Sequence, residues 1–391
     1  METEVNAVGR AIPKEINGKK LVGYKGSCKY KPDIPTRAAP KLKFHTPRAS
    51  KILPNLKEAL IKSGLKDGDT ISFHHHFRGG DNVMLYTFKI IKELGIKNLT
   101  LSPSSIHPVH APLIEYIEDG TITNIECGVT GPVGEAISKG KLKGLLTIRS
   151  HGGRPRAIES GQTHINVAVI AAPAADEYGN INGVLGDYAC GPLGYAHPDA
   201  RYADYVIAVT NNLVEYPNPI IAIPQDLVDA VVVIDEPIGN PEKIVSGTTR
   251  ITRDPVRLLI AQRVVDVIIA SGLLKDGFSY QSGASGITLA TTYFLKDYME
   301  EHNIKGSFAS GGSTAALVEM LEKGLFKTIL DVQAFDTVAV KSLRDNPNHL
   351  EMGSSMYANP YTAGCVVDKL DCVVLGATAV SYTHLRAHET R

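Results

Sequence analysis

Basic side chains gather in two short stretches of this sequence, and both could bind an anion. The first stretch, HHHFRGGD, begins at His74, and the second, RSHGGRPR, begins at Arg149. A guanidinium group matches a carboxylate with two parallel hydrogen bonds, and a histidine beside it can donate another. The side chains that we predict to bind a polycarboxylate are His75, Arg78, Arg149, His151 and Arg154.

Two other interpretations of these stretches stay open. The three consecutive histidines suggest a metal site, but neighbouring side chains of an extended segment point to opposite sides, so the three cannot converge on one ion. No CxxC or HExxH pattern lies nearby to complete a ligand set, and we therefore predict no metal. Arg149 and Arg156 could instead pair on the surface with acids such as Glu159, because exposed ion pairs are commonplace.

Glycine-rich segments could bring backbone amides close to a ligand. Two of them, at 281–286 and 310–314, each join a predicted strand to a predicted helix. Exposed amides there could hold the oxyanion of a tetrahedral acyl intermediate or the phosphates of a nucleotide, and Gln281 could add a side-chain donor. Two more clusters, at 176–183 and 190–194, carry a weaker signal, since such loops also simply turn the chain.

The common nucleotide and hydrolase motifs are missing from these segments. Neither glycine segment of the second half matches GxxxxGK(S/T), and the spacing does not suit GxGxxG with its acidic partner. No GxSxG pattern is present either, so a hydrolase triad is unsupported.

One unit of sequence occurs twice, 208 residues apart. Ser63 and Ser271 each begin a Ser-Gly-Leu triplet, which is followed by Asp-Gly, a strand-like run, a glycine turn, a helical stretch and an Ile-Lys pair. The spacing from the serine to the isoleucine is 33 residues in both copies. Solenoid repeats recur over much shorter periods, so this one predicts two tandem domains, with a ligand cleft between them.

Hydrophobic periodicity predicts that both copies are α/β. Helical patterns occupy 52–63, 83–94, 254–271 and 314–321. Strand patterns occupy 70–73, 99–102, 144–148, 167–172, 205–210, 231–234, 307–309, 328–332 and 372–375. Short strands that alternate with helices favour an open, mostly parallel sheet covered on both faces.

Composition excludes several classes of protein. The 391 residues are 43% hydrophobic and 21% charged, which is a normal soluble composition. Lysine plus arginine equals aspartate plus glutamate, 41 each, so no global field draws the protein to nucleic acid or to an anionic membrane. The five cysteines are scattered and follow no secretory leader, which predicts the cytoplasm, and no apolar run approaches the length of a membrane span.

These patterns divide the chain into four parts. Residues 1–44 form an N-terminal extension, 45–245 the first domain and 246–380 the second domain. If the second domain matched the first in size, it would continue past the end of the sequence, so we expect it to be incomplete. The last segment, SYTHLRAHETR at 381–391, has no apolar periodicity, and we interpret it as a non-native tail, the alternative being a natural polar one.

The chain resembles the α subunit of citrate lyase, the citrate CoA-transferase of that complex, over about 1–379. The stretches that carry the resemblance are HHHFRGGD, SSIHPVHAP, RSHGGRPRAIE, AADEYGNINGV, ACGPLGYAHPDA, VSGTTRITRDP, FASGGSTA, DVQAFD and YANP. The resemblance implies two domains of the CoA-transferase type, the second truncated here. It also implies an acyl exchange, in which citrate displaces acetate from an acetyl thioester on an acyl carrier subunit before a β subunit cleaves the citryl thioester.

The resemblance implies that the thiol belongs to a CoA-like phosphopantetheine group on the γ acyl carrier subunit, with free CoA thioesters as possible substrates and no cofactor bound covalently to this chain. Related CoA-transferases use a glutamate nucleophile, and our alignment places Gly311 at its position, so citrate itself would attack. The residues expected to stabilise the oxyanions are Gln281, Gly283, Gly311 and Gly312. Those expected to frame the thioester are Gly183, Gly191, Gly194, Gly286 and Ser310.

Two alternative functions stay open from the sequence. The chain could be a CoA-transferase for another hydroxy-diacid such as citramalate, which the same basic side chains would bind. It could also be a non-catalytic ligand-binding or scaffold subunit, although scaffolding requires no convergent anion donors.

Overall fold

The computed structural model describes residues 2–7, 9–16, 18–23, 36–245 and 250–376, together with the backbone of 379–380 and 386–387. The predicted tail at 381–391 therefore lies almost wholly outside the described residues, as does the 246–249 linker. Four short strands pair as two antiparallel hairpins near the N-terminus: β1 (Thr3–Val5), β2 (Ala11–Pro13), β3 (Glu15–Ile16) and β4 (Lys19–Lys20).

The first domain contains a sheet of seven strands in the order β5-β15-β14-β11-β6-β7-β9, and every pair in it is parallel. The strands are β5 (Ile52–Leu53), β6 (Thr70–Ser72), β7 (Leu99–Leu101), β9 (Ile122–Ile125), β11 (Val167–Ala171), β14 (Tyr205–Thr210) and β15 (Ala230–Val233). All five residues of the central strand β11 are buried, as expected where both faces of a parallel sheet are covered.

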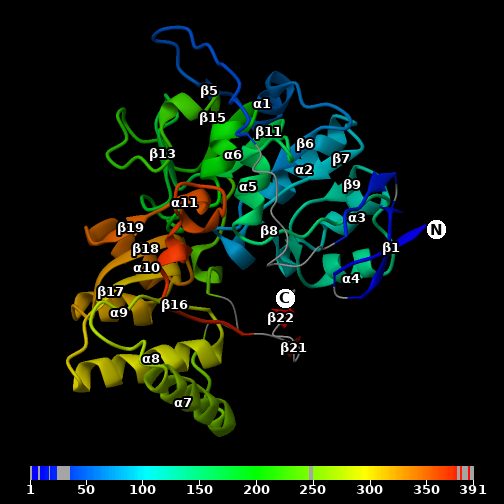
Figure 1. Cartoon of the computed structure of the whole chain (residues 1–391). Helices are drawn as coiled ribbons and strands as arrows, with labels where there is room; N and C mark the ends of the chain where they lie inside the picture. Colours follow the sequence, from blue (N-terminus) through cyan, green and yellow to red (C-terminus); the bar gives the residue numbers. More distant parts are fainter. Residues whose placement is uncertain are drawn as a thin grey trace.

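The second domain contains a sheet of five strands in the order β19-β18-β17-β16-β20, again parallel throughout. The strands are β16 (Tyr280–Ser282), β17 (Gly306–Ser313), β18 (Phe326–Ala334), β19 (His349–Glu351) and β20 (Cys372–Val374). Figure 1 shows the two sheets with their helices as separate bodies that meet along one side. The predicted class, two tandem open parallel-sheet α/β domains, is confirmed.

Helices alternate with these strands in both domains. The first domain has α1 (Leu56–Ser63), α2 (Val83–Glu93), α3 (Leu113–Glu118), α4 (Pro132–Ser138), α5 (Gly153–Glu159) and α6 (His197–Tyr202). The second has α7 (Pro255–Ala270), α8 (Gly286–Glu301), α9 (Ala315–Glu322), α10 (Thr337–Asp345) and α11 (Ser354–Ala358). The remaining short strands are β8 (Ser105–Ile106), β10 (Gly128–Val129), β12 (Ala174–Ala175), β13 (Ile181–Asn182), β21 (Ala379–Val380) and β22 (Arg386–Ala387). Across the described residues, we find no helix with the length and apolar character that spanning a membrane would need.

The repeated sequence unit forms the same local structure twice. Ser63 is the last residue of α1 and Ser271 directly follows α7, and each hydroxyl oxygen accepts from the leucine N–H two residues later at 3.3 Å. The glycines that follow them, Gly64 and Gly272, both have φ of 72°, the left-handed conformation that glycine adopts without strain. In each copy an aspartate carboxylate, Asp67 or Asp276, then accepts from the backbone N–H of the lysine of the Ile-Lys pair.

Three local predictions differ from the structure. The helix expected from residue 52 begins only at Leu56, because Pro54 disfavours a helical residue before it and Asn55 caps the helix by accepting from Glu58. The strand expected at 144–148 is an extended edge segment with a single bridge to Ile125. The glycine segment expected to join a strand to a helix at 310–314 is the end of strand β17 itself, with a bulge between Gly311 and Gly312.

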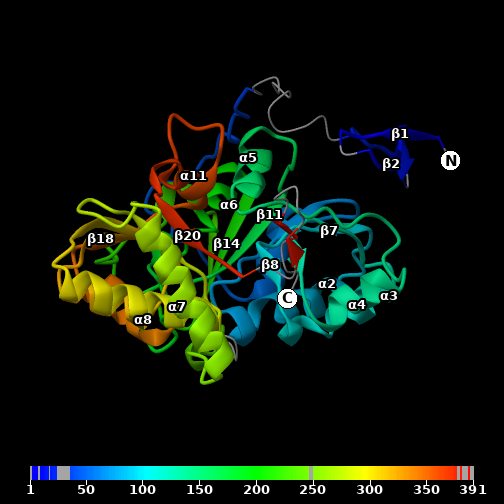
Figure 2. The same ribbon diagram turned by 60° about the horizontal axis from the view of Figure 1, so that its bottom comes forward.

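The domains are joined by α11, which contacts α5 and α6 of the first domain (Figures 1 and 2). Glu159 at the end of α5 accepts from the Ser355 hydroxyl and from Asn359 Nδ2, the latter at 3.3 Å. Glu351 at the end of β19 accepts from the backbone N–H of Leu193 at 2.8 Å and pairs with His197 Nε2 at 3.1 Å. These carboxylates fix the second domain against the first and thereby define the space between them.

Candidate active site

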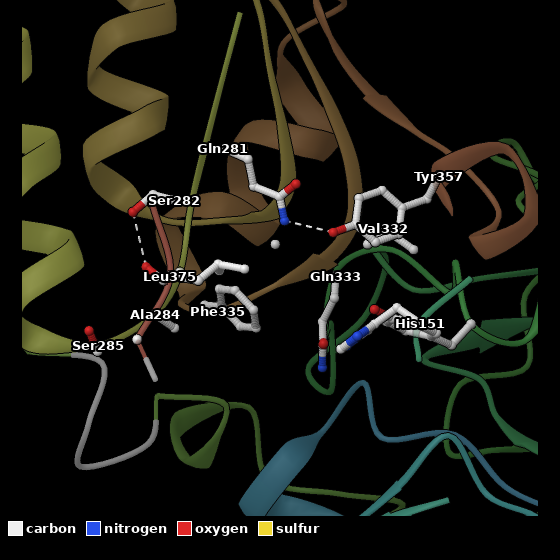
Figure 3. Close-up of a pocket in the computed structure, with 14 residues that line it drawn as sticks. His151, Gln281, Ser282, Ala284, Ser285, Val332, Gln333, Phe335, Tyr357 and Leu375 are labelled. Carbon is white, nitrogen blue, oxygen red and sulfur yellow. Dashed lines mark hydrogen bonds between the residues drawn. The ribbon is translucent and has the colours of Figure 1, made fainter. Parts of the chain in front are cut away.

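A cavity of about 270 Å³ lies where the carboxyl ends of β16, β17 and β18 face the first domain (Figure 3). Its lining residues are His151 and Tyr195 from the first domain and Gln281, Ser282, Gly283, Ala284, Ser285, Gly312, Val332, Gln333, Phe335, Tyr357, Leu375 and Gly376 from the second. Strand ends of open parallel sheets are the usual location of ligands in α/β proteins. The cavity brings together three of the predicted residues of the second domain and one of the first.

Gln281 is the middle residue of strand β16, and its amide lies in the cavity. Its Nε2 donates to the hydroxyl oxygen of Tyr357 at 2.6 Å, as the dashed line in Figure 3 marks. The amide reaches this position because Gly311 has no side chain: a β-carbon there would lie 2.5 Å from Nε2 of Gln281. Gly311 also has φ of +95°, a conformation that other residues rarely adopt. Gly311 thus lies behind the Gln281 amide and is not itself a lining residue.

Gly312 lines the cavity and supports an aromatic ring. A β-carbon at Gly312 would lie 2.0 Å from Cε2 of Phe335, so the ring packs directly on the glycine backbone. The guanidinium of Arg78, from the first domain, lies 4.6 Å from the centroid of the same ring. This cation–π contact places Arg78 next to the cavity wall, behind Phe335.

Histidine and tyrosine rings of the first domain form a second wall. The centroid of the Tyr195 ring lies 4.9 Å from that of His75 and 5.6 Å from that of His151. Burial lowers the pKa of His75 well below its ordinary value, and the nearby His107 and His151 lower it further. His75 is therefore neutral at physiological pH, and its Nδ1 lies 2.5 Å from the hydroxyl of Ser104.

The two remaining arginines of the predicted anion site contact protein groups. Arg154 is buried and forms two hydrogen bonds of 2.7 Å with the carboxylate of Asp199 and a third of 2.8 Å with the carbonyl oxygen of Ser102. Arg149 lies 3.5 Å from Glu126, and not beside Glu159 as the surface interpretation expected. Neither arginine lines the cavity, so contact with substrate stays a prediction for both.

The glycines predicted to frame a thioester lie at tight backbone contacts outside the cavity lining. A β-carbon at Gly183 would lie 1.8 Å from the carbonyl oxygen of Gly191, and one at Gly194 would lie 2.5 Å from that of Met352. Gly286 begins α8 and lies against the backbone of Arg250. These four glycines permit close packing, much of it between the domains, and their role towards a thioester stays a prediction.

Ser310 is the fifth residue of that predicted set. It is buried on β17, and its hydroxyl has no hydrogen-bond partner among the described residues. It does not line the cavity, and a role towards the thioester stays a prediction for it too.

Two backbone amides of the 283–285 segment already donate to protein acceptors. The N–H of Gly283 donates to the carbonyl oxygen of Val374 at 2.8 Å, and that of Ser285 donates to the Thr288 hydroxyl at 2.9 Å. Strand β17 pairs on both sides, with β16 and β18. Side chains, notably the Gln281 amide and the Tyr357 hydroxyl, therefore supply much of the cavity's hydrogen-bonding capacity.

Several lining residues were not singled out from the sequence. Tyr195, Gln333, Phe335 and Tyr357 come from three separate segments that only the tertiary structure brings together. The stretches GPLGYAH, DVQAFD and YANP contain them, but a single tyrosine or glutamine has no diagnostic spacing. Among the described residues no group of three or more histidine, cysteine or acidic side chains is arranged to hold a metal ion.

The arrangement suits transfer of an acyl group. His151 on one side can bind a carboxylate, with His75 and Arg78 next to the lining rings of Tyr195 and Phe335, while the amide and hydroxyl donors of the second domain can stabilise a developing oxyanion. Within the residues that line the cavity there is no carboxylate or thiol that could act as a nucleophile. A carboxylate supplied by the substrate could take the place of the protein nucleophile that this lining lacks.

Comparison with known proteins gives a consistent result. The family model described as citrate lyase, alpha subunit, matches residues 49–384. The citrate lyase alpha chain of Haemophilus influenzae is 47% identical over 336 residues, covering 86% of this chain and 67% of that protein. The Escherichia coli citrate lyase alpha chain is 46% identical over 345 residues, covering 88% of this chain and 68% of its own length. The chain thus spans about two thirds of the length of these relatives.

Solved structures agree with this family. A Streptococcus mutans protein named as the α subunit of citrate lyase, solved in complex with citrate, has 46% identity and a TM-score of 0.91, over 96% of this chain and 73% of that one. The malonate decarboxylase α subunit of Acinetobacter baumannii has 19% identity and a TM-score of 0.58, over 78% of this chain and 55% of that one. The second likeness is one of fold alone.

Proposed function

The chain belongs to the citrate lyase α-subunit family, whose activity is citrate CoA-transfer, and from this premise we propose how its residues carry out the exchange. The reaction converts an acetyl thioester and citrate into a citryl thioester and acetate. The observation that carries the proposal is the cavity between the domains, which has His151 on the wall of the first domain, the Gln281 amide on the wall of the second, and no carboxylate or thiol among its described lining residues.

The exchange takes place in two additions. An oxygen of a citrate carboxylate attacks the acetyl carbonyl carbon, the carbonyl electrons move onto oxygen, and collapse of this oxyanion expels the thiolate and leaves a mixed anhydride. The thiolate then attacks the citryl carbonyl carbon of the anhydride, and collapse of the second oxyanion expels acetate. No proton is gained or lost overall, so the site must position reactants and stabilise negative charge.

We assign the citrate carboxylates to the wall of the first domain. His151 lines the cavity, and His75 and Arg78 lie immediately behind Tyr195 and Phe335. Arg149 and Arg154 lie on either side of His151 in the sequence. In the structure Arg149 pairs with Glu126, and Arg154 pairs with Asp199. We propose that they contribute to citrate binding by fixing the position of the 149–156 segment.

We assign the oxyanions to the wall of the second domain. Gln281 projects its amide into the cavity, and Gly311 provides the space that this amide occupies. The backbone of Gly283 and Gly312 lines the same space, and Ser310 and Gly286 flank it in sequence. Small residues here leave room for a thioester to approach.

We propose that the thioester arm enters past the 283–285 segment and Gly376, because the small side chains there leave the most room in the cavity lining. This route would suit a narrow phosphopantetheine chain, whose thiol supplies the leaving group of the first addition.

The α subunit belongs to a multi-subunit assembly, and we propose a β lyase subunit and a γ acyl carrier subunit as its partners there. The cytoplasm is the proposed location.

The purified chain tests this function directly. With acetyl-labelled acetyl-CoA as the thioester, addition of citrate should release labelled acetate and produce citryl-CoA detectable by mass spectrometry. Citramalate in place of citrate measures whether the third carboxylate matters. Release of acetate without a citryl thioester would indicate hydrolysis and contradict the proposal, and a hydroxylamine-sensitive glutamyl adduct on the protein would contradict citrate as the nucleophile.

A further inference from the structure

The hydroxyl of Tyr357 is the least explained polar group of the cavity. Tyr357 lies on α11, the short helix of the second domain that packs against the first. Its ring points into the cavity, with the hydroxyl next to the amide of Gln281 (Figure 3). The residue as a whole is 8% exposed and therefore buried. Polar groups in such surroundings normally have their hydrogen-bonding capacity satisfied.

Only one side of this hydroxyl is used. Its oxygen accepts the 2.6 Å hydrogen bond from Nε2 of Gln281, which leaves the phenolic hydrogen to be donated elsewhere. Within the described parts of the chain, no acceptor for that hydrogen lies within hydrogen-bonding distance. Burial raises the pKa of Tyr357, so the phenol keeps its hydrogen at neutral pH and acts as a donor.

Other donors of the cavity are less suited to this role. The N–H groups of Gly283 and Ser285 already donate to protein acceptors. Tyr195 lies with its ring against His75 and His151, on the wall assigned to citrate. Tyr357 is on the opposite wall, beside the amide assigned to the oxyanion, and the hydrogen bond from Gln281 polarises its O–H bond further.

We propose that the Tyr357 hydroxyl donates a hydrogen bond to the acyl oxygen that becomes negatively charged in each addition, while Gln281 fixes the position of that hydroxyl. This role rests on the proposed acyl exchange and adds a catalytic residue to it. The hydrogen stays on the phenol oxygen throughout, because neither addition needs a proton. Tyr357 thus stabilises charge, and Gln281 acts on it as a positioning residue.

Tyr357→Phe removes the hydroxyl alone and is the first test. Loss of one oxyanion donor typically lowers kcat by about 100- to 1,000-fold, and we expect a loss of this order with the KM for citrate changed by less than about threefold. Tyr293→Phe is the matched control, since Tyr293 lies on α8 outside the cavity lining and should keep wild-type rates. Near-wild-type kcat in Tyr357→Phe would overturn the proposal.

A spectroscopic measurement tests the contact without turnover. Infrared spectra of bound acetyl-CoA carrying ¹³C at the acetyl carbonyl should give a stretch at lower wavenumber than in solution, because a hydrogen bond weakens the C=O bond. This displacement should shrink in Tyr357→Phe and persist in Tyr293→Phe. An unchanged band in Tyr357→Phe would contradict the contact even if the protein had no exchange activity, whereas absence of exchange in the wild type would contradict the proposed function alone.

A third measurement separates donation from a purely structural role. Replacing Tyr357 by 3-fluorotyrosine and 3,5-difluorotyrosine makes the phenol progressively more acidic with little change of size. A hydroxyl that donates to the oxyanion should support a kcat that rises with acidity at a pH where the phenol stays protonated. A hydroxyl that only accepts from Gln281 becomes a poorer acceptor, so a kcat that is flat or falls along the series would overturn the proposal.

Discussion

The side-chain amide of Gln333 donates from Nε2 to the carbonyl oxygen of His75 at 3.0 Å, so that one hydrogen bond crosses from the second sheet to the loop after β6. The same carbonyl accepts from the backbone N–H of Arg78 at 2.8 Å. The loop that presents His75 and Arg78 is therefore positioned partly by a residue of the opposite domain, and that residue also lines the cavity.

Gln333→Leu keeps the side chain's volume but removes the donor to His75. We expect unfolding to require about 1 kcal/mol less free energy, as is typical for one lost hydrogen bond, and the citrate KM to rise because the loop bearing Arg78 is less well fixed. Urea denaturation and initial rates measure the two effects. Gln262→Leu, at an exposed position of α7, should change the free energy of unfolding by no more than about 0.5 kcal/mol. An equal loss of unfolding free energy in both variants would refute the interdomain role.

Gly311→Ala should damage catalysis more than stability. The added methyl would lie 2.5 Å from Nε2 of Gln281 and push the amide away from Tyr357, so we expect kcat to fall by at least about tenfold. Gly277→Ala is the control, because Gly277 has φ of +87° against +95° for Gly311 but nothing within 4 Å of a new β-carbon. Both variants should lose about 1 kcal/mol to backbone strain, measured by thermal unfolding, and only Gly311→Ala should lose rate.

Arg154→Met tests whether this arginine acts on folding or on substrate. Removing it leaves the buried Asp199 carboxylate without its two hydrogen bonds, and such losses typically cost about 3–5 kcal/mol. Arg149→Met should cost about 1 kcal/mol or less, since its partner Glu126 is 3.5 Å away. Equal and small stability losses, accompanied by a large rise in citrate KM, would instead place both arginines on the substrate.

Acid should destabilise the protein through its buried histidines. Burial, together with the neighbouring His74, lowers the pKa of His76 from 6.5 to about 4, and burial does the same for His107. The unfolded chain then binds these protons more tightly than the folded chain, so their contribution is complete above about pH 6.5 and is lost as the pH falls towards 4.

For His76 alone the depression from 6.5 to about 4 corresponds to about 3 kcal/mol. Urea midpoints measured between pH 7.5 and 4.5 should fall, and His76→Gln should flatten that dependence. His302→Gln, at an exposed histidine after α8, should leave the change of urea midpoint with pH as in the wild type. A slope unaffected by the His76 change would contradict this assignment.

The sequence was sufficient to predict the fold because its signals are local. Ser63 and Ser271 begin units whose glycine conformations and hydrogen bonds match in the structure, and buried strands such as β14 lie where the apolar runs predicted them. The site was only partly predictable. His151, Gln281 and Gly312 stand in recognisable motifs and line the cavity, whereas Tyr357 and Gln333 reach it through packing between distant segments, which periodicity does not encode.

The presence of glycine, which has no side chain, at position 311 has a kinetic consequence. In the proposed direct attack by citrate no acetyl group is stored on the protein between two half-reactions, in keeping with the absence of a carboxylate or thiol at Gly311 and among the described residues that line the cavity. Citrate and the thioester must then occupy the site together. Double-reciprocal plots at varied concentrations of both should give intersecting lines, and not the parallel lines of a ping-pong enzyme.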